Sequence, residues 1–212
     1  MWWFPKKGFG VMAEIILASS NEGKVNEFRE MTSEFPVQLT SLKDHWQPLP
    51  DIEETGDTFY ENAKIKADWV FEHSGGVWAL ADDSGLEVDA LGGAPGVHSA
   101  RFAGESKSSE DNNRKLLELL SDVADNLRTA RFRCVLVLKT GPNSYIEAQG
   151  VCEGTILHSP RGGGGFGYDP LFVPEGGTAS FAEIDSSVKH RVSHRGKAMK
   201  QLSEIISSLF GQ

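Results

Sequence analysis

Apolar positions in the first part of the chain change from strand-like to helix-like spacing and back. The run EIILAS at residues 14–19 is apolar and β-branched, which predicts a first strand. Apolar side chains then recur at helical spacing over residues 25–35, which predicts a helix that begins near Lys24. Residues 36–42 predict a second strand, so this part of the chain should fold as strand, helix and strand.

The next helical pattern has a start signal and a stop signal. Thr58 and Glu61 have the spacing of a capping box, in which each side chain bonds the backbone N–H of the other residue. The pattern then continues to Gly75 and Gly76, which end it. These signals predict a helix that begins after Thr58 and stops before the glycine pair.

A buried strand is predicted to end on two negative charges. The apolar run VWALA at residues 77–81 leads directly into Asp82 and Asp83, and LEVDAL at residues 86–91 predicts a separate segment that pairs locally. Adjacent like charges repel, and burying either is costly unless a positive group compensates it. The aspartate pair therefore marks a candidate functional site.

The second half of the chain alternates in the same way. Residues 108–123 predict a helix with leucines on one face. Residues 130–140 and 144–157 predict two long strands, which the short turn G-P-N should make antiparallel neighbours. Residues 171–174 predict one more short strand.

Two helices are predicted towards the C-terminus. Ser180 and Glu183 repeat the capping-box spacing, which predicts a short helix over residues 180–188. Apolar side chains on a 3.6-residue period predict a final helix over residues 196–210. The alternation of strands and helices indicates the α/β class, and the antiparallel pair indicates a mixed sheet.

Composition narrows the classes of function. The chain has 212 residues, 39% of them hydrophobic, and a net charge of −9 from 30 acidic and 21 basic residues. The negative charge argues against general nucleic-acid binding, and no apolar run has the length of a membrane span. Cys134 and Cys152 fit no metal or redox spacing, which favours a reducing cytoplasm. We expect one domain over residues 12–212, with residues 1–11 an N-terminal extension or a cloning remnant, or else a short ordered arm.

The segment S-S-N-E-G-K, residues 19–24, lies where the first strand meets the first helix. A helix N-terminus offers unpaired N–H groups and a positive dipole end, both suited to phosphate, and Lys24 adds a charge. The alternative is an ordinary helix cap with a surface lysine, since Ser and Asn are common caps. The segment does not have the G-x-x-x-x-G-K-[ST] spacing of glycines and lysine that defines a Walker A loop.

Two acidic segments are candidate metal ligands. Glu53 and Glu54 precede a helix, and Asp82 and Asp83 follow a buried strand. Mg²⁺ prefers oxygen ligands and commonly takes one or two carboxylates plus substrate phosphates. Successive strand side chains point to opposite faces, so we expect one aspartate to face the ligand and choose Asp83, which adjoins turn residues. The glutamates could instead simply complement the dipole of the helix that follows them, on a solvated surface. The aspartates could form an Asx turn at the end of the strand.

Another candidate site lies in two segments, G-G-G-G-F-G-Y-D-P at residues 162–170 and K-H-R-V-S-H-R-G at residues 189–196. Glycines let backbone approach a ligand closely, at an entropic cost, and Phe166 and Tyr168 offer aromatic faces suited to a purine. The second segment concentrates basic side chains in an acidic protein. The alternatives are a flexible linker and a solvated basic turn.

Taken together, these motifs resemble the inosine triphosphate pyrophosphatase family, also called Ham1-like or non-canonical purine NTP pyrophosphatases. The matching stretches are SSNEGK, EETGDTFYENAKIKA, ADDSGLEVDALGGAPGVHSARFAG, GGGFGYDPLFVP and SHRGKA, in that order, and span most of the chain. The resemblance implies hydrolysis of ITP, dITP or XTP to the monophosphate and pyrophosphate, with Mg²⁺ as cofactor. It also implies an elongated two-lobed α/β fold around a long mixed sheet, an active site in the cleft between the lobes, and a homodimer.

The resemblance also implies roles for particular residues. Asp83 resembles the general base and metal ligand, and Glu54 the other metal-binding carboxylate, with Glu53 and Asp82 as further candidates. His190 and Arg191 lie between the matches and are expected at the surface. The implied substrate-binding residues are Ser19, Ser20, Asn21, Glu22, Gly23, Lys24, Ser84, Phe166, Gly167, Tyr168, Asp169, Lys189, His194 and Arg195.

Some alternatives stay open at this point. A metal ligand is a weaker base than a free carboxylate, so Asp82 or Glu54 could share the role of Asp83. A Maf-like pyrophosphatase would share the metal and the leaving group but act on other modified nucleotides. A nucleotide sensor would bind without turnover, although an intact carboxylate set argues against it. No Nudix pattern is present.

Overall fold

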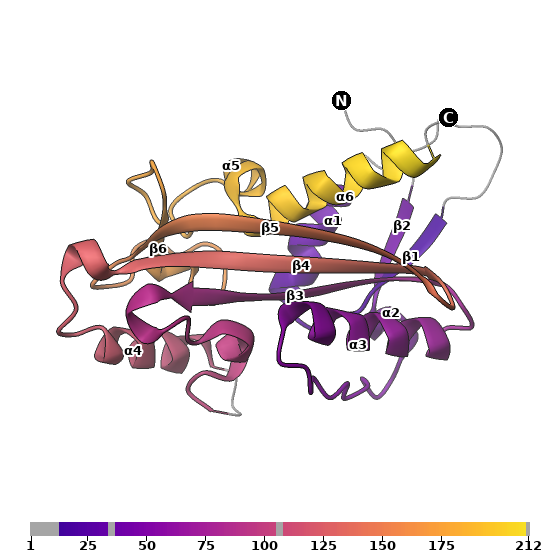
Figure 1. The fold of residues 1–212 in the computed structure, drawn as a ribbon, viewed down its shortest axis with the longest axis horizontal. Coiled ribbons are helices and arrows are strands. Elements are labelled where there is room, and N and C mark those ends of the chain that lie inside the picture. Colours follow the sequence, from indigo (N-terminus) through magenta and orange to yellow (C-terminus); the bar gives the residue numbers. More distant parts are fainter. Residues whose placement is uncertain (1–12, 34–36, 105–107, 211–212) are drawn as a thin grey trace. The chain divides into compact units, whose positions relative to one another are not determined.

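The computed structural model describes residues 13–33, 37–104 and 108–210 (Figure 1). Within these ranges, six strands form one sheet in the order β2-β1-β3-β4-β5-β6. The strands are β1 (Ala13–Leu17), β2 (Val37–Ser41), β3 (Trp78–Val88), β4 (Thr129–Gly141), β5 (Ser144–Ile156) and β6 (Phe172–Pro174). The α-helices are α1 (Glu22–Thr32), α2 (Leu42–His45), α3 (Phe59–His73), α4 (Ser109–Leu119), α5 (Ser186–Val192) and α6 (His194–Phe210).

The sheet is mixed, as predicted, and the α/β class is confirmed. Strand β1 pairs in parallel with both β2 and β3, whereas β5 and β6 pair antiparallel. The chain divides into two compact units that share the long strands. The first unit comprises residues 1–83, 135–149 and 198–212, and the second comprises residues 84–134 and 150–197.

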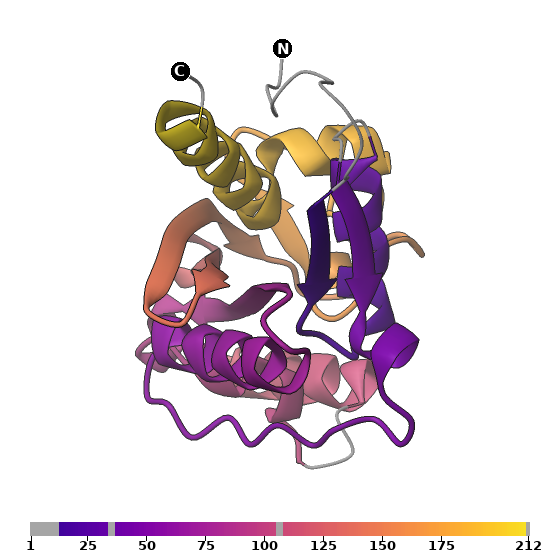
Figure 2. The same ribbon diagram turned by 90° about the vertical axis from the view of Figure 1, so that its right-hand side faces the viewer.

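In the first unit, β1 lies between its two parallel neighbours, with Leu17 opposite both Ser41 and Leu80. Figure 2 shows β1 and β2 side by side, with α1 next to them. Helix α3 packs small residues, chiefly Ala63 and Ala67, into a core that α3 shares with β1 and β3. This packing brings Lys66, on one face of α3, close to Asp83 of β3.

Side-chain caps set the starts of the two helices that matter most here. Asn21 caps α1 by accepting a hydrogen bond from the backbone N of Lys24 at 3.1 Å, so the helix begins at Glu22, slightly earlier than predicted. Thr58 and Glu61 form the predicted capping box at the start of α3. Such caps stabilise a helix by about 1 kcal/mol and fix where it begins.

The prediction that a strand ends at the paired aspartates is wrong. Strand β3 continues through Asp82 and Asp83 to Val88, so the segment predicted to pair locally forms the second part of the same strand. Both aspartates are buried, with 1% and 5% of their surface exposed. A strand tolerates two buried carboxylates only where positive groups reach them, and lysines from other elements do so here.

The second unit has its own core, built from leucines and aromatic residues of β3 to β6 and α4. Within it, Arg128 is 2% exposed and donates hydrogen bonds to three backbone carbonyls, those of Leu120, Ile156 and Leu157. The Leu120 carbonyl lies at the C-terminal end of α4, where carbonyls lack partners within the helix. Arg128 thus joins this helix end to the end of β5.

The predicted helix over residues 180–188 is wrong in its first part. Glu183 accepts a hydrogen bond from the backbone N of Ser180, but the Ser180 hydroxyl donates to the carbonyl of Arg161 instead of capping a helix. Only half of the capping box forms, and α5 begins at Ser186.

The final helix begins at His194 rather than at Gly196. A Cβ atom on Gly196 would lie 1.6 Å from the carbonyl oxygen of His190, so only glycine allows this close approach of α6 to α5. The expectations for residues 1–11 and for Phe35 fall outside the described residues. Within the described ranges, no helix combines the length and the apolar character needed to cross a membrane.

Candidate active site

In the first unit, the chain leaves β1 through the S-S-N-E-G-K turn. Ser19 accepts a hydrogen bond from the backbone N of Asn21 at 3.2 Å, which shapes the turn. The first turn of α1 then presents backbone N–H groups and the positive end of the helix dipole. Ser20 and Glu22 are exposed, and Glu22 forms an ion pair with Lys43. The turn therefore offers the kind of hydrogen-bond donors and positive dipole end that suit an anion.

Lys24 connects this turn to β3. Its Nζ atom lies 3.4 Å from a carboxylate oxygen of Asp82 and 3.4 Å from the Asp82 carbonyl. The contact follows from topology, because β1 and β3 are parallel neighbours and both run towards this end of the sheet. The Lys24 side chain is 14% exposed, so solvent reaches it, whereas the Asp82 side chain is fully shielded.

Asp83 contacts a lysine on α3 that the sequence interpretation did not assign. Lys66 Nζ lies 2.9 Å from Oδ1 of Asp83 and 3.3 Å from Oε2 of Glu54. Asp82 and Asp83 thus meet different lysines, as expected for successive strand residues. We call Lys24, Glu54, Lys66, Asp82 and Asp83 the carboxylate cluster.

The loop that carries Glu54 is tied to the start of α3. Asn62 accepts a hydrogen bond from the backbone N of Gly56 at 2.8 Å, and its side chain is buried. Glu61 accepts from the backbone N atoms of Asp57 and Thr58. These bonds hold Glu54 beside Lys66. Glu53 is exposed and lies outside the carboxylate cluster.

The pKa values of the two carboxylates beside Lys66 shift in opposite directions. Burial raises the pKa of Asp83 above its usual range, although Lys66 and Lys24 oppose the shift. Burial acts the same way on Glu54, but the charges of Lys66 and Lys24 outweigh it and hold the pKa of Glu54 below its usual range. Carboxylates whose pKa values are pushed apart can take different roles in acid–base chemistry.

The carboxylate cluster fits a divalent cation. Oδ2 of Asp83 is shielded from solvent and accepts no hydrogen bond from any described residue, which leaves one carboxylate oxygen available. No group of three or more His, Cys, Asp or Glu side chains in the described ranges is arranged to hold a metal by itself. Mg²⁺ commonly takes one or two carboxylates and completes its shell with waters and phosphate oxygens, so Asp83 and Glu54 suffice for that mode.

In the second unit, Asp169 organises the glycine loop, defined here as residues 162–167. Its Oδ2 atom accepts from the backbone N of Phe166 at 2.8 Å and from Lys189 Nζ at 2.6 Å. A Cβ atom on Gly165 would lie 2.1 Å from the same oxygen, and Gly165 has a φ of +69°, so glycine is required there. Asp169 and Lys189 are both buried and compensate each other.

Arg195 lies beside the Phe166 ring and reaches β3. Its guanidinium carbon lies 5.1 Å from the ring centroid, and Nη2 donates a hydrogen bond to the Ser84 hydroxyl at 2.7 Å. Lys189 Nζ lies 5.2 Å from the same centroid. Phe166, which is half-buried, thus presents its ring among cationic groups. Ser84 directly follows Asp83 on β3.

Two predicted substrate contacts serve the core of the second unit. Tyr168 is 4% exposed and donates its hydroxyl to the carbonyl of Ser99 at 2.8 Å, so its ring is not a free stacking face. Burial raises its pKa well above the ordinary range. His194 is buried and stacks on Phe132 at a centroid distance of 4.6 Å. Arg191 is exposed, as expected, and His190 is half-buried.

Lys66 is the main site residue that the sequence interpretation missed. The signal for it was present, because position 66 falls on the apolar stripe of α3, between Ala63, Ala67 and Val70. A lysine on the buried face of a helix is rare unless a carboxylate pairs with it. The motif around it was recognised, but the role of this lysine was not.

Comparison with known proteins gives the family of this chain. A family model described as the Ham1 family matches residues 15–205. A dITP/XTP pyrophosphatase from Desulforamulus reducens is 50% identical over 198 residues, which cover 93% of this chain and 97% of the relative. A dITP/XTP pyrophosphatase from Oceanobacillus iheyensis is 43% identical, with 93% of this chain and 100% of the relative covered.

Solved structures agree in fold. A HAM1 protein from Coxiella burnetii superposes with a TM-score of 0.82 at 42% identity, covering 93% of this chain and 100% of that protein. The Ham1 protein of Staphylococcus aureus superposes with a TM-score of 0.80 at 37% identity, covering 92% and 99%. Family match, sequence identity and fold agree over nearly the whole chain, and the chain therefore belongs to the Ham1 family.

Proposed function

We propose that this protein is a Mg²⁺-dependent pyrophosphatase that hydrolyses dITP, ITP and XTP to the monophosphate and pyrophosphate. The observation that carries the proposal is the carboxylate cluster, in which a buried Asp83 with one free oxygen lies beside Lys66 and Glu54. The names of the relatives supply the substrate class. This activity would remove deaminated purines from the nucleotide pool.

The first unit supplies groups suited to the triphosphate. Lys24 and the first-turn N–H groups of α1 would bind the phosphate tail by charge and hydrogen bonding. Asp83 and Glu54 would hold Mg²⁺, which when bound neutralises charge on phosphate oxygens. Lys66 would hold the two carboxylates in place, and its charge opposes the rise in pKa that burial causes in each of them. Charge builds on leaving oxygens in phosphoryl chemistry, so this arrangement acts mainly by positioning and electrostatics.

Asp83 is the residue that we assign as general base. The reaction requires a water molecule to attack the α-phosphorus as pyrophosphate leaves, and the attacking water must lose a proton. The family resemblance supports Asp83 in this role, and its buried carboxylate, one oxygen of which accepts no hydrogen bond from the described residues, is compatible with it. Asp82 is the weaker candidate, because its side chain is fully shielded beside Lys24.

The second unit supplies groups suited to the purine base of the nucleotide. Hypoxanthine and xanthine carry a 6-oxo acceptor where adenine carries a 6-amino donor. Arg195 is the best-placed donor, because its planar guanidinium lies beside the Phe166 ring and carries several N–H groups, whereas the Lys189 ammonium is held by Asp169. A site lined with hydrogen-bond donors discriminates against a purine that lacks the matching acceptor, by as much as ~10⁴-fold in kcat/KM. Phe166 would stack on the ring without discriminating.

Assembly and compartment belong to the same proposal. The family resemblance supports a homodimer, which size-exclusion chromatography with light scattering would test. Cys134 and Cys152 are both buried thiols, which is compatible with a cytoplasmic protein.

The direct test is pyrophosphate release from dITP, ITP, XTP, GTP, ATP and dTTP, measured in parallel with Mg²⁺ and with EDTA. We expect fast release from the first three nucleotides, dependent on the metal, with the monophosphate as the other product. Release from dTTP instead would indicate a Maf-like activity. Binding of dITP with no release under any condition would indicate a sensor, and either result would refute the proposal.

A further inference from the structure

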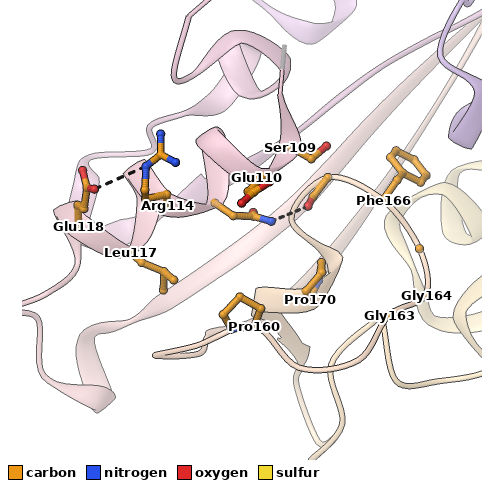
Figure 3. Close-up of a pocket in the computed structure, with 13 residues that line it drawn as sticks. Ser109, Glu110, Arg114, Leu117, Glu118, Pro160, Gly163, Gly164, Phe166 and Pro170 are labelled. Atoms are coloured by element: carbon orange, nitrogen blue, oxygen red, sulfur yellow. Dashed lines mark hydrogen bonds and ion pairs between the residues drawn. The ribbon is translucent and has the colours of Figure 1, made fainter. Parts of the chain in front are cut away.

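A pocket of about 560 Å³ lies between α4 and the glycine loop (Figure 3). Leu117 forms part of its wall on the helix side, and Pro160 and Pro170 line it near the two ends of the loop. The loop backbone from Gly163 to Gly167 forms another part of the wall. On this side the glycine loop borders open space rather than packed side chains, so its position depends on a small number of specific contacts.

Asn113 makes one of those contacts. Its Nδ2 atom donates a hydrogen bond to the carbonyl of Gly167 at 3.0 Å, drawn in Figure 3 as a dashed line from α4 to the loop. Gly167 lies between Phe166 and Tyr168 and has a φ of +61°. The backbone N of Phe166 is held in turn by Asp169. The Phe166–Gly167 segment is therefore fixed at both ends, by Asp169 at one and by Asn113 at the other.

The Asn113 side chain is poorly suited to a purely structural role. Its Oδ1 atom is shielded from solvent and accepts no hydrogen bond from the described residues. Shielding a polar atom without a partner is unfavourable, so an apolar side chain of the same size would serve stability as well or better. Leu116 and Leu117, on the same helix, pack in or against the core of the second unit, so apolar residues suit α4 well. The benefit of an asparagine here is the single bond to the Gly167 carbonyl.

We propose that Asn113 is a positioning residue for nucleotide binding: it holds the Gly167 carbonyl and thereby fixes the Phe166 ring beside Arg195 and Lys189. The inference rests on the proposed function, since it assigns the glycine loop to the base of the substrate. Asn113 contacts neither the base nor the phosphates in this scheme. It acts from the opposite side of the loop, through the backbone.

Two substitutions remove the donor while keeping the size of the side chain, Asn113→Leu and Asn113→Asp. Both should raise KM for dITP by about tenfold, the equivalent of one hydrogen bond, with little change in kcat. The melting temperature of Asn113→Leu should equal or exceed that of the wild type, because the unpaired Oδ1 is gone. Arg114→Ala is the control, since Arg114 also lines the pocket, is exposed and pairs with Asp111 rather than with the loop.

Hydrogen exchange provides a readout that does not depend on catalysis. Amides of residues 162–167 should exchange faster in both Asn113 variants than in the wild type and in Arg114→Ala. Unchanged exchange in this loop, or faster exchange with an unchanged KM for dITP, would overturn the inference. A lower melting temperature with unchanged KM would show a structural role and also overturn it. If the wild type released no pyrophosphate from dITP, the proposed function would fail, and the exchange data would still decide whether Asn113 holds the loop.

Discussion

The Nζ atom of Lys66 lies 2.9 Å from Oδ1 of Asp83, and both side chains are less than a tenth exposed. This pair explains how β3 can continue through two adjacent aspartates. Without the lysine, Asp83 and Glu54 would repel each other in a partly desolvated environment. The pKa of Lys66 is raised even though burial opposes this, because the two carboxylates outweigh the desolvation.

Replacing Lys66 by Met should therefore destabilise the protein by about 3 kcal/mol, since it leaves a buried carboxylate without its partner. Denaturant unfolding in EDTA measures this directly. Lys64→Met is the matched control on the same helix, because Lys64 pairs with a partly exposed Asp68, and its loss should cost about 1 kcal/mol or less. Mg²⁺ should restore more stability to Lys66→Met than it adds to the wild type. Equal losses for the two variants would contradict this role of Lys66.

Asp83→Asn tests the assignment of the general base. Asparagine keeps the shape of the side chain and can still accept from Lys66, so the fold should persist. Turnover of dITP should fall by about 10² to 10⁴, the usual range for loss of a general base. Asp82→Asn should lower kcat far less, because Asp82 lies on the Lys24 side of the strand. If steady-state kinetics ranked the two variants in the opposite order, the base would be Asp82.

Arg195 should control the choice between 6-oxo and 6-amino purines. Arg195→Ala removes the donor beside Phe166, so kcat/KM for dITP should fall by about 10- to 100-fold, with a smaller change for dATP. Arg191→Ala, at an exposed position on α5, is the control and should change neither value. A dITP to dATP ratio that stays constant in Arg195→Ala would assign base reading to other groups.

Most elements of the fold could be predicted because they depend on local patterns. The capping box at Thr58 and the apolar stripe of α3 are both properties of one segment. The prediction of a helix that begins after Ser180 was wrong, because the hydroxyl that should cap it donates to the carbonyl of Arg161 instead. The prediction that β3 ends at the two aspartates was wrong for a similar reason, since the compensating charge of Lys66 comes from α3, a separate element.

The candidate site was predictable as a set of motifs but not as a set of contacts. The charges at the end of an apolar run made Asp83 a candidate, but only the family resemblance assigned a role to Glu54, and the structure places both beside one lysine. Tyr168 looked like a stacking face in the sequence, yet its ring belongs to the core. Periodicity shows that a residue can be buried, but not which of two neighbouring aromatic rings will be.

Asp68 provides a test of stability against pH away from the carboxylate cluster. It accepts hydrogen bonds from Lys139 and from Tyr145, and Lys64 also pairs with it. Burial alone would raise the pKa of Asp68, but these hydrogen bonds outweigh it and hold the pKa below its usual range. A lowered pKa in the folded state means that ionised Asp68 stabilises the fold above the unfolded pKa of about 3.9 and that this contribution is lost as pH falls through the folded value.

Asp68→Asn should therefore reduce the free energy of unfolding by about 2 kcal/mol at pH 7, because hydrogen bonds to a charged group are lost. The difference from the wild type should stay constant down to about pH 5 and shrink below about pH 4, where wild-type Asp68 also becomes neutral. Urea unfolding across this range measures both quantities. Glu72→Gln, at an exposed position on the same helix, should show no such convergence. A difference that persisted unchanged at acid pH would mean that Asp68 stabilises α3 by its shape and not by its charge.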